Sequence, residues 1–145
     1  MNIIEEILNK LSDRVIEFKE HNPKRIYIEI NPLDIVDVTK ILYDEYNLRF
    51  SIASGTDTRH NFEILYHFSD DATGKIISIR TFLKDKNNPE IESITPVMKA
   101  AEWIEREMHE LLGIKFIGHP NLKHLLLPDD WPKDKYPLRN NNDRK

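Results

Sequence analysis

The 145-residue sequence contains no cysteine and only four glycines. Without cysteine the chain forms no disulfide, has no thiol nucleophile and cannot bind an iron–sulfur cluster through thiolates of its own. With so few glycines, the glycine-rich backbone loops that bind phosphate groups are scarcely available, and no P-loop or Gly-x-Gly-x-x-Gly pattern occurs. These absences argue against an enzyme that acts independently with its own redox centre or nucleotide.

Long apolar runs and a strong charge imbalance are also missing. No stretch approaches the roughly 20 apolar residues that span a membrane, and the first residues lack the basic and apolar regions of a signal peptide. The 21 basic and 25 acidic side chains give a net charge of −4, which has the wrong sign for a general nucleic-acid-binding protein. We therefore expect a soluble domain without a nucleic-acid partner, which reaches a membrane only through another protein.

Hydrophobic periodicity predicts an α+β fold with a small mixed or antiparallel sheet and two or three packing helices. Apolar residues at three- and four-residue spacing predict helices over residues 2–11, from residue 32 to about residue 47, and over residues 97–112. Asn31 and Pro32 are typical of the N-cap and first turn of the second helix. Alternating apolar residues predict strands at residues 15–18, 25–30, 49–54, 61–68 and 75–83.

The last part of the chain differs in character. Proline recurs at positions 120, 128, 132 and 137, which excludes a long helix or a central strand there. The segment nevertheless carries several leucines, Trp131 and Tyr136. We therefore divide the chain into an α+β domain, residues 1–117, and an extended proline-rich C-terminal arm, residues 118–145. Such an arm either packs on its own domain or lies along a partner, and its aromatic and basic residues favour a partner surface.

The helix at 97–112 carries the densest charge. Glu102, Arg106 and Glu110 are spaced by four residues, which is typical of a solvated ladder of salt bridges. Glu105 and Glu107 lie at the two edges of the apolar stripe, where a covered carboxylate needs a partner. Residues two apart on a helix point about 200° from one another, so these two glutamates are poorly placed as an acid/base pair. No histidine spacing indicates a metal site.

The run from Glu105 to Leu122 reads Glu-Arg-Glu-Met-His-Glu-Leu-Leu-Gly-Ile-Lys-Phe-Ile-Gly-His-Pro-Asn-Leu. It resembles the motif of the C subunit of respiratory NADH dehydrogenase (complex I), a family that includes the homologous subunit of membrane-bound, energy-converting nickel–iron hydrogenases. The resemblance continues through Ile94-Thr95-Pro96-Val97 and Trp103 upstream and through Leu127-Pro128-Asp129-Asp130-Trp131 downstream. The short tail is closer to the hydrogenase branch. Glu110 stands where the family usually has Asp, and Lys123-His124 where two basic residues are common.

The resemblance implies a non-catalytic structural subunit in the peripheral arm of a membrane-bound redox complex. It would pack against a hydrogenase-like large subunit, with an iron–sulfur small subunit nearby, on the cytoplasmic face of the cell membrane. No cofactor is expected in this chain, because iron–sulfur clusters and any nickel–iron centre would belong to the partners. The residues that the resemblance assigns to the family motif and to partner contacts are Glu105, Arg106, Glu107, Glu110, Gly113, Phe116, Gly118, His119, Pro120, Leu122, Trp131, Pro137, Leu138 and Arg139.

The resemblance further implies that the end of the helix and the following loop are held by charge-assisted hydrogen bonds of Glu105, Arg106, Glu107 and Glu110. Gly113 would let the chain leave the helix, and Gly118-His119-Pro120 would turn it toward the partner. Three alternatives stay open: a free-standing protein-interaction domain, a small-molecule enzyme that uses Glu105 and Glu107, and a His119 that titrates beside a redox centre.

Overall fold

A five-stranded mixed sheet forms the centre of the fold. The computed structural model describes residues 2–123, 126–128, 130–132 and 135–139. The strand order is β1-β2-β5-β4-β3, and β2 and β5 pair parallel while the other neighbours pair antiparallel. The predicted α+β class is therefore confirmed. The bounds are β1 (Val15–Asn22), β2 (Arg25–Ile30), β3 (Arg49–Asp57), β4 (Phe62–Asp70) and β5 (Lys75–Leu83).

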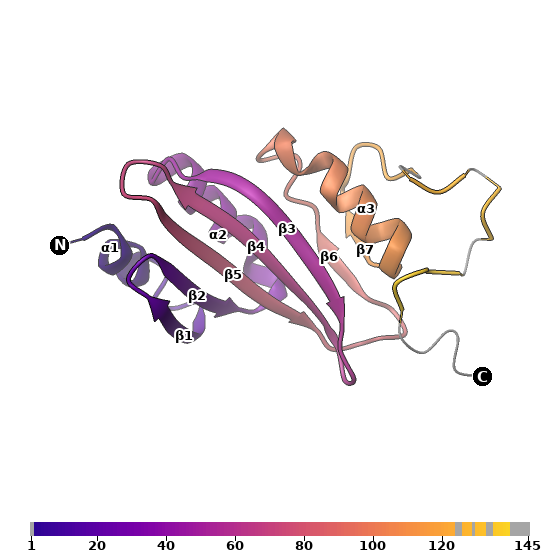
Figure 1. Cartoon of the computed structure of the whole chain (residues 1–145), viewed down its shortest axis with the longest axis horizontal. Helices are drawn as coiled ribbons and strands as arrows, with labels where there is room; N and C mark the ends of the chain where they lie inside the picture. The colour runs from indigo at the N-terminus through magenta and orange to yellow at the C-terminus, as the bar shows by residue number, and fades with distance from the viewer. Residues whose placement is uncertain (1, 124–125, 129, 133–134, 140–145) are drawn as a thin grey trace.

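Three α-helices accompany the sheet in the described part of the chain. They are α1 (Ile3–Lys10), α2 (Ile35–Lys40) and α3 (Glu102–Leu112). Figure 1 shows α2 behind the sheet and α3 beside strand β3, which forms one edge. Two short strands, β6 (Glu90–Glu92) and β7 (Lys115–Ile117), pair parallel in a small second sheet near α3.

One face of the large sheet is buried. Phe62, Ile64, Tyr66 and Phe68 alternate along β4 and are all inaccessible to solvent, as the sequence pattern predicts. Residues of α1, α2 and α3, together with β6 and β7, join the same hydrophobic cluster. The cluster therefore connects the sheet to α3, the helix that carries the charged motif.

The second predicted helix begins as expected and then changes character. The side chain of Asn31 accepts a hydrogen bond from the backbone N–H of Leu33, with Pro32 in the first turn. The helix passes through a 3-10 turn (Pro32–Asp34), α2 and a π-helical turn (Ile41–Glu45).

The third predicted helix begins later than residue 97. Met98 is extended, with φ −141°, and a 3-10 turn (Lys99–Ala101) precedes α3. The prediction was wrong here because Val97 and Met98 continue the helical spacing although they lie before the helix. Strands β6 and β7 were also missed, since three residues are too few for alternation to be recognised.

Candidate functional site

The three residues of the Glu-Arg-Glu run on α3 have different surroundings. Glu105 is fully buried. Arg106 Nε donates to the backbone carbonyl of Lys123, 3.1 Å away. Glu107 lines a groove between α3 and β3. Glu105 therefore lies in the core, Arg106 binds the segment after β7, and Glu107 faces an open surface.

The Glu105 carboxylate is satisfied by the residues that come just before α3. Oε1 accepts hydrogen bonds from the hydroxyls of Ser93 (2.5 Å) and Thr95 (2.6 Å), and Oε2 accepts one from the backbone N–H of Ile94 (2.9 Å). All three donors are buried. A buried carboxylate is tolerable only with such donors. Glu105 therefore binds residues 93–95, which come before α3, to the helix.

Two further groups lie close to Glu105. The His119 side chain is fully buried, and its Nε2 is 3.9 Å from Glu105 Oε1. Tyr66 has a fully buried side chain, and its hydroxyl has no hydrogen-bond partner in the described part of the chain. Burial raises the pKa of Tyr66 well above its ordinary value, and the negative charge of Glu105 raises it further.

His119 links the segment after β7 to the beginning of α3. Its Nε2 lies 3.0 Å from the backbone carbonyl of Glu102, and its Nδ1 accepts from the backbone N–H of Asn121 at 2.9 Å. This pattern uses both ring nitrogens in the neutral Nε2–H tautomer. The histidine thus fixes the turn that begins at Gly118, whose φ is +82°.

Glu110, the other buried glutamate of α3, accepts hydrogen bonds from backbone N–H groups of the C-terminal segment. We call residues 118–139, as far as the structure describes them, the strap. The Glu110 carboxylate is buried and accepts from the backbone N–H groups of Leu126 (2.7 and 2.8 Å) and Leu127 (2.9 Å). The solvated ladder was therefore wrong at Glu110, because the strap covers this face of the helix.

The far end of the strap returns to the C-terminus of α3. The backbone N–H of Leu138 donates to the Leu111 carbonyl (2.9 Å), and Arg139 Nε donates to the Leu112 carbonyl (2.6 Å). These two carbonyls belong to the last turn, which has no partners within the helix. The strap therefore caps α3 while the helix anchors the strap.

Gly113 makes this contact possible. It ends α3 in the left-handed region, with φ +79°, as a C-cap glycine does. A Cβ at this position would lie 2.6 Å from an Arg139 nitrogen and 2.7 Å from a Tyr136 ring carbon. The Arg139 guanidinium also sits over the rings of Tyr136 (4.5 Å) and Phe62 (5.1 Å). The predicted role of Gly113 at the helix exit thus has a second part, which is room for the strap.

The remaining predicted residues divide between the core and the surface. Phe116 is buried in β7, and Leu122 packs against the core cluster. Trp131 is half-buried, and its indole N–H donates to the Lys135 carbonyl at 2.8 Å. Pro120, Pro137 and Leu138 are exposed, and so is the side chain of Leu126, whose backbone N–H binds Glu110. His124 and Leu125 lie outside the described residues.

Sequence reasoning missed the partners of these residues. Ser93 and Thr95 were not connected with Glu105, and Gly55 was not connected with α3. A Cβ on Gly55 would lie 2.7 Å from a Leu112 methyl carbon, so glycine allows the close approach of β3 to the helix. An isolated glycine inside a strand indicates such an approach, but it does not say which element approaches.

The described residues show no metal-binding or membrane-spanning feature. No group of three or more His, Asp or Glu side chains among them is placed to hold a metal ion. None of their helices is long and apolar enough to cross a membrane. Glu105 and Glu107 have separate surroundings, so they form no acid/base pair.

The fold and the motif define a class: a small α+β domain whose last helix is hydrogen-bonded to a strap. The family model described as "Respiratory-chain NADH dehydrogenase, 30 Kd subunit" matches residues 28–145. The chain belongs to this family, which confirms the predicted resemblance. The family places it among the subunits of complex I-like and hydrogenase-like membrane complexes.

Two relatives align with nearly the whole chain. The C subunit of the NADH-quinone oxidoreductase of Roseiflexus sp. (strain RS-1) is 31% identical over 143 residues, which cover 94% of this chain and 80% of that protein. Hydrogenase-4 component G of Escherichia coli (strain K12) is 29% identical over 140 residues, which cover 94% of this chain. The alignment spans only 25% of that longer protein.

Two solved structures share the fold. One comes from the membrane-bound sulfane sulfur reductase, an archaeal respiratory membrane complex, with a TM-score of 0.83 and 23% identity over 94% of this chain and 81% of the matched chain. The other is a trypsin-resistant fragment of Nqo5, with a TM-score of 0.65 and 18% identity over 83% of this chain and 96% of the fragment. At these identities the likeness concerns the fold alone.

Proposed function

We propose that this chain is a non-catalytic structural subunit in the peripheral arm of a membrane-bound redox complex of the hydrogenase or NADH dehydrogenase type. It holds the large subunit, the one related to nickel–iron hydrogenase large subunits, by means of α3 and the strap. Family membership supports the kind of complex. The geometry of the strap supports the holding role.

The observation that carries this proposal is a strap that is hydrogen-bonded to α3 at two places and exposes an apolar side chain, Leu126 or Leu138, at each of them. Glu110 binds its first part through Leu126 and Leu127, and the last turn of α3 binds its end through Leu138 and Arg139. Leu126 is nevertheless 64% exposed. A loop fixed before binding loses less conformational entropy when a partner covers it.

The composition of the chain indicates which subunits hold the metal centres. Since the sequence has no cysteine, cysteine-bound iron–sulfur clusters belong to the partner subunits, and so does any nickel–iron centre. The iron–sulfur small subunit lies nearby. The chain is cytoplasmic and associates with the inner face of the cell membrane through the complex.

Co-purification with the large subunit tests the proposal. The tagged chain is expressed together with the other subunits of its complex, and the retained large subunit is quantified. Leu126→Asp should reduce the retained large subunit at least about tenfold, because a buried contact would receive an unpaired charge. Leu33→Asp is the matched control, since Leu33 is 83% exposed and lies in the 3-10 turn before α2.

Both variants should keep the unfolding midpoint of the unmodified chain, since each replaces an exposed residue. Equal retention by the two variants would contradict the role of the strap. If the unmodified chain does not retain the large subunit at all, it is a free-standing interaction domain rather than a subunit of such a complex.

A further inference from the structure

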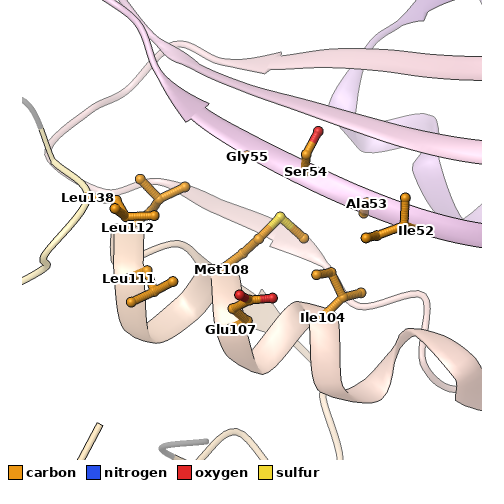
Figure 2. A pocket seen from close by; sticks show the side chains of 10 residues that line it. All are labelled: Ile52, Ala53, Ser54, Gly55, Ile104, Glu107, Met108, Leu111, Leu112 and Leu138. Carbon is orange, nitrogen blue, oxygen red and sulfur yellow. The ribbon is translucent and has the colours of Figure 1, made fainter. Parts of the chain in front are cut away.

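An apolar groove lies between β3 and α3. Its volume is about 240 Å³. In Figure 2, Met108 and Ile104 point from α3 toward β3, and Leu138 of the strap lies at one end beside Leu112. The lining on the β3 side comes from Ile52, Ala53, Ser54 and Gly55. The groove thus adjoins the strap, the surface already assigned to the partner.

Large apolar side chains at or beside this groove remain open to solvent. Ile52 is 53% exposed and Leu138 is 55% exposed. Trp103 is 66% exposed and lies one helical turn before Glu107 on α3. Clustered apolar exposure of this kind marks an interaction surface more often than isolated exposed residues do.

Glu107 puts a negative charge in the lining that no cation of the described residues compensates. Its helical neighbours three and four residues away are Trp103, Ile104, Glu110 and Leu111, none of them cationic. Two arginines near this part of α3 bind backbone carbonyls instead: Arg106 binds that of Lys123, and Arg139 of the strap binds that of Leu112. Among the described residues, Glu107 makes no hydrogen bond or ion pair.

The size of the groove selects the kind of occupant. A dry protein cavity of about 150 Å³ accommodates a benzene molecule, whereas small-molecule sites usually measure about 300–1,000 Å³. A groove of about 240 Å³ therefore suits one large side chain of a protein better than a cofactor. The carboxylate in its lining favours a cation beside that side chain.

We propose that this groove receives one aliphatic or aromatic side chain of the large subunit and that a neighbouring lysine or arginine of the same subunit pairs with Glu107. This inference rests on the proposed function and specifies its contact. Because Leu138 belongs to both the groove and the strap, one continuous surface would contact the partner.

Site-specific photocross-linking in the assembled complex tests the location. Benzoylphenylalanine replaces Ile52, and the cross-linked peptide is identified by mass spectrometry. The matched control carries it at Ile16, which is 60% exposed on β1, the opposite edge of the same sheet. The expected result is a cross-link from position 52, and not from position 16, to a large-subunit peptide with a basic residue near an apolar one.

Charge reversal tests the ion pair. Glu107→Lys should reduce retention of the large subunit at least about tenfold, because like charges placed together are strongly unfavourable. Glu20→Lys makes the same charge change at an exposed position on β1 and should have no effect. Changing the basic residue of the cross-linked peptide to Glu should restore retention of the Glu107→Lys chain.

The outcomes separate this inference from the proposed function. If the unmodified chain retains the large subunit but position 52 cross-links to another subunit, a lipid, a second copy of this chain or nothing, the groove proposal is wrong and the proposed function stands. It is also wrong if Glu107→Lys retains the large subunit as well as Glu20→Lys does. If the unmodified chain retains no large subunit, the proposed function itself fails.

Discussion

The two buried glutamates of α3 show how similar residues acquire different tasks. Glu105 lies near the beginning of the helix, and its donors come from residues 93–95, within 12 positions of it along the chain. Glu110 lies near the end, and its donors come from Leu126 and Leu127, 16 and 17 positions away. Both side chains are almost inaccessible to solvent.

The difference lies in what each carboxylate joins. Glu105 binds a segment that passes directly into the hydrophobic core, where Ile94 is fully buried. Glu110 binds a strap whose neighbouring Leu126 side chain is largely exposed. We infer that the Glu105 carboxylate stabilises the whole domain, whereas the Glu110 carboxylate stabilises mainly the strap. Substitutions at the two ends should therefore separate global from local unfolding.

Glu105→Ala should have the largest effect. It leaves the hydroxyls of Ser93 and Thr95 and the backbone N–H of Ile94 without their acceptor. Each unsatisfied buried donor costs about 1–3 kcal/mol, so we expect the free energy of unfolding to fall by about 3 kcal/mol or more. Urea denaturation followed by circular dichroism measures it. Glu105→Gln keeps one acceptor oxygen and should lose less, and equal losses would argue against hydrogen bonding as the cause.

Gly113→Ala should come next, and Gly74→Ala is its matched control. Both glycines are left-handed, with φ of +79° and +73°, so both substitutions cost about 1–2 kcal/mol of backbone strain. Only at Gly113 would the new methyl group meet the strap, whereas at Gly74 the nearest atom is 4.0 Å away. Gly113→Ala should therefore lose more stability and also make the strap sensitive to limited proteolysis. Equal sensitivity of the two variants would contradict the anchoring of the strap by the helix end.

Glu110→Gln should act locally. The amide replaces one acceptor oxygen with a donor that faces the backbone N–H groups of Leu126 and Leu127. We expect these two amides to lose about 1–2 kcal/mol of protection, measured by hydrogen–deuterium exchange, while the amides of β4 stay unchanged. Glu92→Gln, at an exposed position in β6, serves as control. A parallel loss of protection in β4 would remove the distinction between the two helix ends.

Tyr66→Phe should have the smallest effect and the opposite sign. It removes a buried hydroxyl that has no partner in the described part of the chain, so we expect a gain of up to about 1 kcal/mol in the free energy of unfolding. Tyr66 also predicts a pH dependence. Because its pKa is raised in the folded protein, the unfolded chain releases the proton first, and stability is lost as the pH rises above about 10.

Tyr66→Phe should weaken that alkaline loss, which urea titrations at pH 8 and at pH 10.5 would measure. A variant that is less stable at pH 8 would show that the hydroxyl has a hydrogen-bond partner. An unchanged alkaline loss would show that a group other than Tyr66 causes it.

Much of the fold follows from local patterns. The alternation in β4, the N-cap at Asn31 and the helix exit at Gly113 each depend on neighbouring residues, and each is found where the sequence predicts it. Where local and tertiary influences disagree, prediction fails. Val97 and Met98 fit a helical stripe, yet they precede α3 in a segment that Glu105 holds through Ser93, Ile94 and Thr95.

The candidate site was predicted only in part, for the same reason. Periodicity assigned Glu110 to a solvated face, because it describes a single helix and not what covers it. The family resemblance instead assigned Glu110 to the loop after the helix, and its donors Leu126 and Leu127 lie there. The contacts of Arg139 with Phe62 and with the last turn of α3 join residues far apart in the chain.

The sequence by itself determined the α+β class, the family and the identity of the charged residues, because these depend on composition, short-range periodicity and a contiguous motif. Only the tertiary structure decided which glutamate is buried in the core, which one holds the strap and which one lies open in a groove. Burial of a charge depends on donors brought to it from elsewhere in the chain, and the spacing of residues along one helix contains no information about them.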